Sequence, residues 1–292
     1  MYLYSKLQNL KKPIRIAFIG CGKFVSMFLA QYNQLNKIIL DTIVELDIDR
    51  AKKNCLNSGL SNETIDKINF TDNLDEVFNR EIDVFIEATG NPIAGTLHAK
   101  KIIESKKHVI MVNVEADVLC GKYLSDLAKK NNVICSMAYG DQPALTCELV
   151  DWARSCGFTV VAAGKGTKFL PSYHVSTPDT VWDHYGLNAE QAAEAGMNSQ
   201  MFNSFLDGTK SALEMAAIAN ATGLSCPADG LRFPPVGMDD LAHILRPIDA
   251  GGMLEASGQV EVVSSLERDG RPVPLRRALQ QGALRGRWPA GA

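Results

Sequence analysis

The sequence predicts an α/β protein in which a doubly wound parallel sheet is followed by a second, α+β domain. Residues 14–136 alternate between short β-rich runs and longer segments with helical spacing of apolar residues. The runs Ile14–Ile19, Val84–Ala88 and His108–Val112 are almost continuously apolar, which is typical of parallel strands that helices cover on both faces. Beyond Gly164 the chain is richer in Gly, Pro, Ser and Asn, and this shift in composition indicates a second domain.

Strands and helices are expected to alternate through the first half of the chain. The expected strands are Ile14–Ile19, Thr42–Leu46, Val84–Ala88, His108–Val112 and Val133–Ser136. The expected helices are Lys23–Leu35, Asp49–Asn57, Asn91–Ser105 and Gly121–Lys130. Pro92 suits the first turn of its helix, and the basic residues that end the last helix complement a helix C-terminus.

The second half predicts a helix over Ala144–Cys156, a strand over Thr159–Ala163 and a long helix over Phe202–Thr222. We predict domains over 1–150 and 151–266, followed by an irregular tail over 267–292. Two domains fit the length, because single cores stop growing at roughly 250–300 residues. The tail is rich in Pro, Arg, Gly and Ala, so it is either a disordered tail or an abnormal end of the coding sequence.

The composition excludes several classes of protein. Hydrophobic residues make up 46% of the chain and the net charge is −3, which gives no support for nucleic-acid binding. No apolar run approaches the ~18 residues of a membrane helix, and the N-terminus does not resemble a signal peptide. The cysteines are odd in number, 7, and form no CxxC, so neither a disulfide framework nor a zinc site is expected. We expect a cytoplasmic homo-oligomer that acts on a small molecule, without nucleic acid or membrane.

A glycine motif follows the first predicted strand in Ile-Gly-Cys-Gly-Lys-Phe-Val. Gly20 permits a tight turn, and Gly22 lets the backbone approach a pyrophosphate at the start of the next helix. Lys23 and Phe24 begin that helix and are expected to border the cofactor. Val25 stands where the complete fingerprint has a third glycine. This pattern predicts a Rossmann domain that binds NAD or NADP.

Asp47 is the acidic residue that closes the second predicted strand. A carboxylate there can accept both hydroxyls of the adenosine ribose and repels a 2′-phosphate, which favours NAD over NADP. Ile48 agrees with this choice, whereas the nearby Arg50 keeps NADP open. Alternatively, Asp47 only caps the helix that begins near Asp49.

Two further strand ends are expected to complete the cofactor crevice, because ligands of open α/β sheets bind at the carboxyl ends of the strands. Ala88, Thr89 and Gly90 leave one strand, and their small size lets the cofactor ribose approach the backbone. Asn113 and Glu115 leave the next strand and are expected near the nicotinamide, with Glu115 a candidate catalytic residue. The other interpretation is that Glu115 only begins the following helix.

Candidate catalytic residues lie in two segments of the second domain. Lys165 stands between two glycines, so its ammonium could reach into a cleft, or the segment is a solvated basic turn. Asp207, Lys210 and Glu214 are spaced i, i+3, i+7 and would share one face of the long helix. An Asp–Lys pair can hold a substrate oxygen or transfer a proton to a carbonyl; the alternative is a solvated stripe of salt bridges.

Several segments together resemble the homoserine-dehydrogenase-like oxidoreductases. These are EATGNP, NVEADVLCG, YGDQPA, AGKGTK, SFLDGTKSALEMAAIANATGL and VEVVSSLERDGRPV, spread over roughly residues 14–273. The branch that they resemble most is that of the 1-deoxy-D-xylulose-5-phosphate reductoisomerase-like enzymes. This resemblance implies nicotinamide-dependent reduction of a carbonyl, assisted by a divalent metal. It also implies that Lys165 and Lys210 contact a phosphate and that Asp207 takes a proton or metal role.

Two departures from the family qualify the resemblance. Asp47 with Ile48 argues against NADPH, and Val114-Glu115 stands where homoserine dehydrogenases carry a lysine. Family members also continue past VEVVSSLERDGRPV, so we expect that a C-terminal portion is missing. The function predicted is NAD(P)-dependent reduction of a small polar carbonyl compound, phosphorylated or not; the alternative is a dinucleotide-binding sensor or scaffold without turnover.

Overall fold

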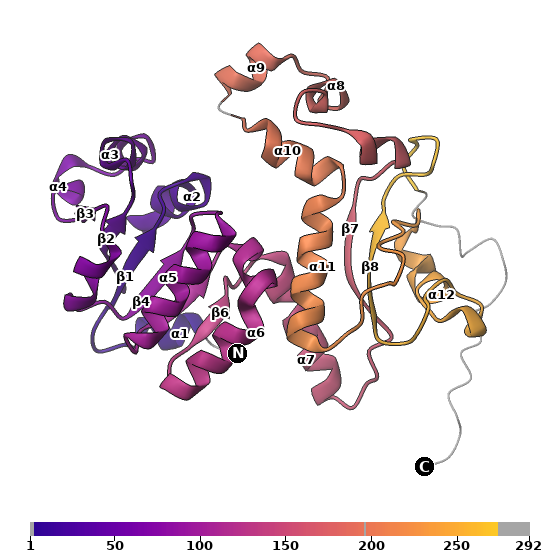
Figure 1. The fold of residues 1–292 in the computed structure, drawn as a ribbon, viewed down its shortest axis with the longest axis horizontal. Coiled ribbons are helices and arrows are strands. Elements are labelled where there is room, and N and C mark those ends of the chain that lie inside the picture. Colours follow the sequence, from indigo (N-terminus) through magenta and orange to yellow (C-terminus); the bar gives the residue numbers. More distant parts are fainter. Residues whose placement is uncertain (1–2, 196, 274–292) are drawn as a thin grey trace. The chain divides into compact units, whose positions relative to one another are not determined.

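The computed structural model describes residues 3–195 and 197–273. The chain divides into two compact units between Ala144 and Leu145 (Figure 1); the sequence predicts a first domain over 1–150. The helix α7, Gln142–Ser155, runs through the dividing point. The predicted α/β class, with a parallel sheet followed by a second domain, is confirmed.

The first unit contains a six-stranded sheet in the order β3-β2-β1-β4-β5-β6, in which every neighbouring pair is parallel. Its strands are β1 Ile14–Ile19, β2 Ile38–Val44, β3 Asn69–Thr71, β4 Val84–Glu87, β5 His108–Met111 and β6 Cys135–Met137. The chain runs outward in one direction from β1 to β3 and in the other from β4 to β6. The order therefore reverses between β1 and β4, and this switch point is where doubly wound sheets bind ligands.

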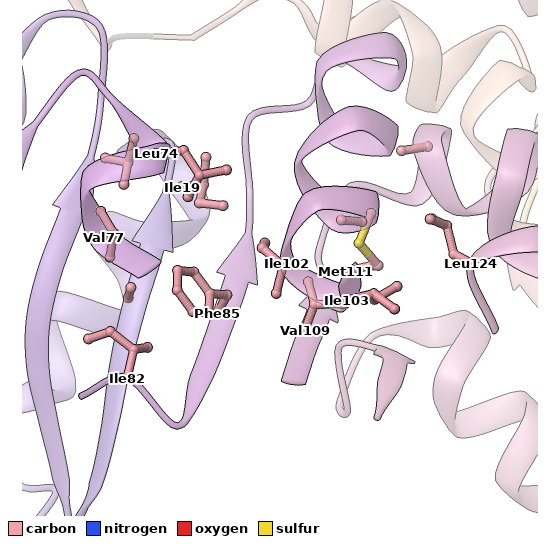
Figure 2. Close-up of a cluster of buried hydrophobic side chains, with 14 of the residues drawn as sticks. Ile19, Leu74, Val77, Ile82, Phe85, Ile102, Ile103, Val109, Met111 and Leu124 are labelled. Atoms are coloured by element: carbon pink, nitrogen blue, oxygen red, sulfur yellow. The ribbon is translucent and has the colours of Figure 1, made fainter. Parts of the chain in front are cut away.

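Helices cover both faces of this sheet (Figure 1). The helices of this unit are α1 Leu3–Gln8, α2 Lys23–Tyr32, α3 Ile48–Asn57, α4 Asn62–Ile65, α5 Pro92–Glu104 and α6 Val114–Asn131, with the 3-10 helix η1 at Leu74–Asn79; α1 has no buried residue. On one face Phe85 and Met111 pack with Ile102, Ile103 and Leu124 of α5 and α6 (Figure 2). A second buried cluster takes residues from β1, β2, α2 and α3. Successive residues of the inner strands thus enter different cores, which explains their continuous apolar runs.

Some elements of this unit differ from the prediction. The second strand begins and ends earlier than expected, at Ile38 and Val44. β3 was not predicted, because it is only three residues long and two of them, Asn69 and Thr71, are polar. The helix α6 begins at Val114 instead of Gly121, since Asn113 caps it.

The second unit pairs β7, Ala162–Thr167, with β8, Gln259–Ser264, in a parallel two-stranded sheet. Its further helices are α8 Val181–Tyr185, α9 Ala189–Glu194, α10 Ser199–Leu206, α11 Thr209–Thr222 and α12 Leu241–Ile244, with 3-10 helices at Pro171–Val175, Met238–Asp240 and Ile248–Ala250. Its core packs Met215 and Ile218 of α11 against Val260 and Val262 of β8. The rings of Phe169 and Phe233 stack in the same cluster, 4.1 Å apart. The strand predicted at Thr159–Ala163 is β7, which begins three residues later.

The long helix predicted over Phe202–Thr222 is wrong in one respect, because it is two helices. α10 ends at Leu206 and α11 begins at Thr209. Gly208 between them has φ +94°, a left-handed conformation that interrupts a helix and favours glycine. A Cβ at Gly208 would lie 3.2 Å from Cζ of Phe233, so packing also requires a glycine there.

Within the described residues, no helix is both long and apolar enough to cross a membrane. Most of the predicted irregular tail, and with it the expectation of an abnormal C-terminal end, lies outside them, since the description ends at residue 273.

Candidate functional site

The loop between β1 and α2 forms a cradle at the switch point of the sheet. Gly20 has φ +89°, and a Cβ on it would lie 2.9 Å from the carbonyl oxygen of Ala88. Its amide donates to the carbonyl oxygen of Val44 at 2.8 Å, so the loop lies between the ends of β2 and β4. Gly20 is therefore required by backbone conformation and by close approach to the neighbouring loop.

Gly22 borders open space, because a Cβ on it would meet no protein atom within 4 Å. It is the N-cap of α2, and no side chain caps this helix. The free amides and the positive end of the helix dipole therefore face open space, an arrangement that suits a phosphate group. Lys23 and Phe24 follow in the exposed first turn, whereas Val25 is fully buried in the core.

Cys21 ties this loop to the neighbouring helix α3. Its side chain is buried, and its carbonyl oxygen accepts a hydrogen bond from Nδ2 of Asn54 at 2.8 Å. Its amide donates to Oε2 of Glu45, also at 2.8 Å. These bonds hold the loop in place from the side of β2, and the amide of Cys21 is directed at Glu45.

Glu45, and not Asp47, is the carboxylate at the end of β2. It follows Val44 directly, and its Oε1 accepts from the amide of Leu46 and pairs with Nη2 of Arg50 at 3.1 Å. Asp47 is the N-cap of α3 and accepts from the amide of Arg50 at 2.9 Å. Asp47 thus occupies the capping position, which is the alternative that the sequence left open. Glu45 was not predicted, because the expected strand ran on to Leu46 whereas β2 ends at Val44.

The loop after β4 lies on the other side of the switch point. The amide of Ala88 donates to the carbonyl oxygen of Ile19, and Thr89 hydrogen-bonds to Glu87 through its hydroxyl at 2.5 Å and its amide at 3.3 Å. Gly90 has φ +72° and would have no protein atom within 4 Å of a Cβ. These small residues therefore leave the backbone of this turn uncovered beside Gly20.

Asn113 and Glu115 stand at the start of α6. The side chain of Asn113 is buried, caps this helix through the amide of Ala116 and donates to the carbonyl oxygen of Asn91 at 2.9 Å. Its side chain thus connects two loops of the protein, although the sequence predicted a contact with the cofactor. Glu115 is half-buried and lies in the first turn of α6. This is the position expected if Glu115 only begins the helix.

In the second unit, Lys165 on β7 forms an ion pair with Glu214 on α11. Only 15% of the Lys165 side chain and 6% of the Glu214 side chain are exposed. A buried pair of this kind is held in a fixed geometry, since either charge alone would be costly to bury. The sequence singled out both residues but did not pair them, because it says nothing of which strand packs on which helix.

Asp207 lies outside the helix that carries Glu214. It ends α10, and its two carboxylate oxygens accept from Nδ2 of Asn203 at 2.9 Å and from the amide of Thr209 at 2.8 Å. It therefore bridges the break between α10 and α11. Lys210 stands in the first turn of α11, one turn before Glu214 and on the same face. The predicted single stripe of three charges is thus divided, with Asp207 at the helix junction.

A cavity of about 570 Å³ opens beside β7 and is lined largely by apolar atoms, including those of Leu241, Leu245 and Val263. Its buried acid, Glu261, accepts hydrogen bonds from the amides of Arg232 and Val262. Burial raises the pKa of Glu261, and these bonds and the charge of Arg232 oppose the increase. The oxygens of Glu261 are thus occupied, and Lys165 also belongs to the lining of this cavity.

The resemblance stated above implies a divalent metal. Across residues 3–195 and 197–273, no group of three or more His, Cys, Asp or Glu side chains is arranged to hold one. The residues described do not fit a metal ion, and no step below depends on one.

The two units match different family models. Residues 14–139 match the model of an oxidoreductase family with an NAD-binding Rossmann fold, GFO/IDH/MocA. Residues 140–274 match the model of the catalytic domain of oxidoreductase DRL. No curated protein matches the chain.

Solved structures with similar folds span a wider range of oxidoreductases. The putative oxidoreductase yvaA from Bacillus subtilis is 18% identical, with 59% of this chain and 47% of that chain covered and a TM-score of 0.41. The WlbA dehydrogenase from Bordetella pertussis, solved with NADH and UDP-GlcNAcA, is 13% identical, with 59% and 50% covered and a TM-score of 0.41. Homoserine dehydrogenase from S. aureus is 21% identical, with 43% and 32% covered and a TM-score of 0.33. The chain spans about half the length or less of these proteins, and likenesses of this size carry no inference about its reaction.

The glycine cradle lies at the switch point of a six-stranded parallel sheet, and the adjoining family matches account for the chain from residue 14 to residue 274. The first unit is thus similar to the NAD-binding Rossmann domain of the GFO/IDH/MocA oxidoreductase family, and the second unit is similar to the catalytic domain of oxidoreductase DRL.

Proposed function

We propose that this oxidoreductase reduces a small polar carbonyl compound, phosphorylated or not, and prefers NADH to NADPH. The observation that carries the proposal is the cradle at Gly20 and Gly22, flanked by the carboxylate of Glu45. The pyrophosphate would rest on the uncapped amides of α2, and the cofactor, when bound, supplies the hydride.

The preference for NADH is argued from Glu45 instead of Asp47. A carboxylate at the end of the second strand accepts the hydroxyls of the adenosine ribose and repels a 2′-phosphate. Only 10% of the Glu45 side chain is exposed, and Arg50 and the amide of Cys21 hold it beside the glycine loop. Asp47 already caps α3, so its removal is expected to affect stability more than affinity.

The catalytic role is assigned to Lys165. Its ammonium would donate a hydrogen bond to the carbonyl oxygen of the substrate and hold a proton there as the oxygen gains charge. Glu214 fixes the position of Lys165, and Lys210 on the same helical face supplies a second positive charge. Two lysines suit a substrate that carries a phosphate or carboxylate group.

The cofactor half is tested by titrating NADH and NADPH into the wild-type chain, Glu45→Ala and Asp47→Ala while nicotinamide fluorescence is followed. We expect Glu45→Ala to weaken NADH by about tenfold, the worth of one hydrogen bond to a charged group, and to remove the preference over NADPH. Asp47→Ala is expected to keep the preference and to lower the melting temperature. An unchanged preference in Glu45→Ala would refute the assignment.

The catalytic half is tested by following NADH consumption with a panel of hydroxyaldehydes, keto acids and their phosphate esters. Loss of a general acid lowers kcat by about 10²-fold or more, so we expect this for Lys165→Met. Lys168→Met is the matched control, because Lys168 stands just beyond the same strand with an exposed side chain. Equal activity of the two variants would remove Lys165 from the reaction.

A further inference from the structure

Glu87 is a fully buried carboxylic acid that the proposed reaction does not use. It ends the apolar strand β4, and none of its surface is exposed. A carboxylate at such a position is costly unless hydrogen bonds satisfy it. Its partners therefore indicate what it holds in place.

One oxygen of Glu87 collects all of the hydrogen bonds that the structure records for this side chain. Oε1 accepts from the hydroxyl and amide of Thr89, and it lies 3.4 Å from Nδ1 of His98. Oε2 is buried and has no hydrogen-bond partner among the described residues. Two hydrogen bonds to Oε1 of Glu87 thus hold Thr89 in place.

Gly95 on α5 creates the space that this arrangement needs. A Cβ at Gly95 would lie 2.9 Å from Oε2 of Glu87 and 2.5 Å from Nδ2 of Asn113. Asn113 in turn donates to the carbonyl oxygen of Asn91 at 2.9 Å and is 3.5 Å from Oγ1 of Thr89. Glu87 and Asn113 therefore hold the turn from Thr89 to Asn91 at both of its ends.

This turn faces the switch point from the side of β4. Ala88, which directly precedes this turn, lies against Gly20, whereas Glu45 flanks the glycine loop on the side of β2. A dinucleotide that places its adenosine near β2 would extend its other half toward β4. Glu87 thus lies beneath the nicotinamide side of the crevice.

We propose that Glu87 is a positioning residue, which acts through Thr89 to hold the turn after β4 in the shape that binds the nicotinamide half of the cofactor. The inference rests on the proposed function, since it requires that NADH binds at the switch point. It differs from a purely structural role in its selectivity: the nicotinamide half should lose affinity while the adenosine half keeps it.

The experiment compares the dissociation constants of NADH and of ADP, which carries only the adenosine half, for the full chain. We expect Glu87→Ala and Thr89→Val to weaken NADH by about tenfold, the worth of a hydrogen bond to a charged group, with ADP affinity unchanged. Glu87→Gln, which keeps an acceptor for the Thr89 hydroxyl, should recover most of the NADH affinity. These three results together would support the assignment.

Asp41→Asn is the control for simple loss of stability. Asp41 is equally buried and forms ion pairs with Arg15 and Arg80, so its substitution should lower the melting temperature and leave the ratio of the two constants as in the wild type. If Glu87→Ala and Thr89→Val changed the dissociation constants of NADH and ADP equally, or changed neither, this inference would be overturned. The proposed function would then still stand. Wild-type chain that binds neither ligand would overturn the proposed function as well.

Discussion

Single residues decide whether the cradle at the switch point can form. Gly20→Ala would introduce a Cβ 2.9 Å from the carbonyl oxygen of Ala88 at φ +89°. We expect NADH to bind at least about tenfold more weakly, because the loop must move away from β4. The matched control is Gly59→Ala, with φ +90° but no atom within 4 Å of the added Cβ, which carries the backbone strain of about 1–2 kcal/mol without the contact. Fluorescence titration that finds equal affinities for the two variants would contradict this prediction.

The buried pair of Lys165 and Glu214 makes a second prediction at this scale. Glu214→Leu removes the carboxylate that pairs with the Lys165 ammonium, and breaking a buried ion pair costs about 3–5 kcal/mol. Lys165→Met combined with Glu214→Leu should recover much of this loss, as apolar replacements of buried pairs often do. Glu63→Leu, which breaks the exposed pair with Lys67, should cost less than about 1 kcal/mol. Urea denaturation measures all three, and additive effects of the two buried substitutions would refute the coupling.

Residues of the candidate site could be predicted from the sequence only where their position next to a strand or helix was enough to identify them. Gly20 and Gly22 follow from their place between a strand and a helix. The choice between Glu45 and Asp47 depends on where β2 ends, and two residues separate these positions. Glu87 was read as part of a strand end, because its burial follows from the packing of α5 and not from its neighbours in sequence.

At the scale of elements, the break between α10 and α11 sets where α11, the helix that carries Lys210 and Glu214, begins. Gly208→Ala would place a Cβ 3.2 Å from Phe233 at φ +94°, and we expect a loss of more than about 1 kcal/mol in the free energy of unfolding. Gly223→Ala at the other end of α11 is the control, because Gly223 has φ +73° and open space around it. Thermal melts should show the larger decrease for Gly208→Ala, and a reversed order would contradict the packing argument.

The first turn of α6 makes stability depend on pH. Burial raises the pKa of Asp117 from 3.8 to about 6. The folded protein therefore binds more protons than the unfolded chain between these values, and stability decreases as pH rises through this window and stays lower above about pH 6. Asp117→Asn should flatten this dependence and stabilise the protein at pH 8 by up to about 3 kcal/mol. Urea denaturation at pH 4 and pH 8 checks this, and an unchanged pH dependence in the variant would disprove it.

The bounds of a buried strand could be predicted from its apolar run, whereas helix starts and breaks could not. β1 runs from Ile14 to Ile19 as predicted, because both of its faces are covered and its residues, apart from Arg15, are apolar. The first turns of α6 were missed, since the helix start depends on a cap at Asn113 whose side chain also bonds to Asn91. The helix break at Gly208 was missed because the flanking segments share one helical pattern. A single glycine in that pattern does not reveal its left-handed conformation.

For the whole molecule, the account depends on the order of the six strands. The reversal between β1 and β4 brings the glycine loop, the end of β2 and the turn after β4 together at the switch point. The second unit carries its own ion pair between β7 and α11. The alternation of strands and helices predicted the sheet, but the two-stranded sheet of the second unit joins segments almost a hundred residues apart, and no local pattern predicts such a pairing.

The central claim is tested most directly by isothermal titration of NADH and of NADPH into the full wild-type chain. The carboxylate of Glu45 at the end of β2 and the cradle at Gly20 predict one site that binds NADH about tenfold or more tightly than NADPH. Tighter binding of NADPH, or no binding of either nucleotide at millimolar concentration, would contradict the claim.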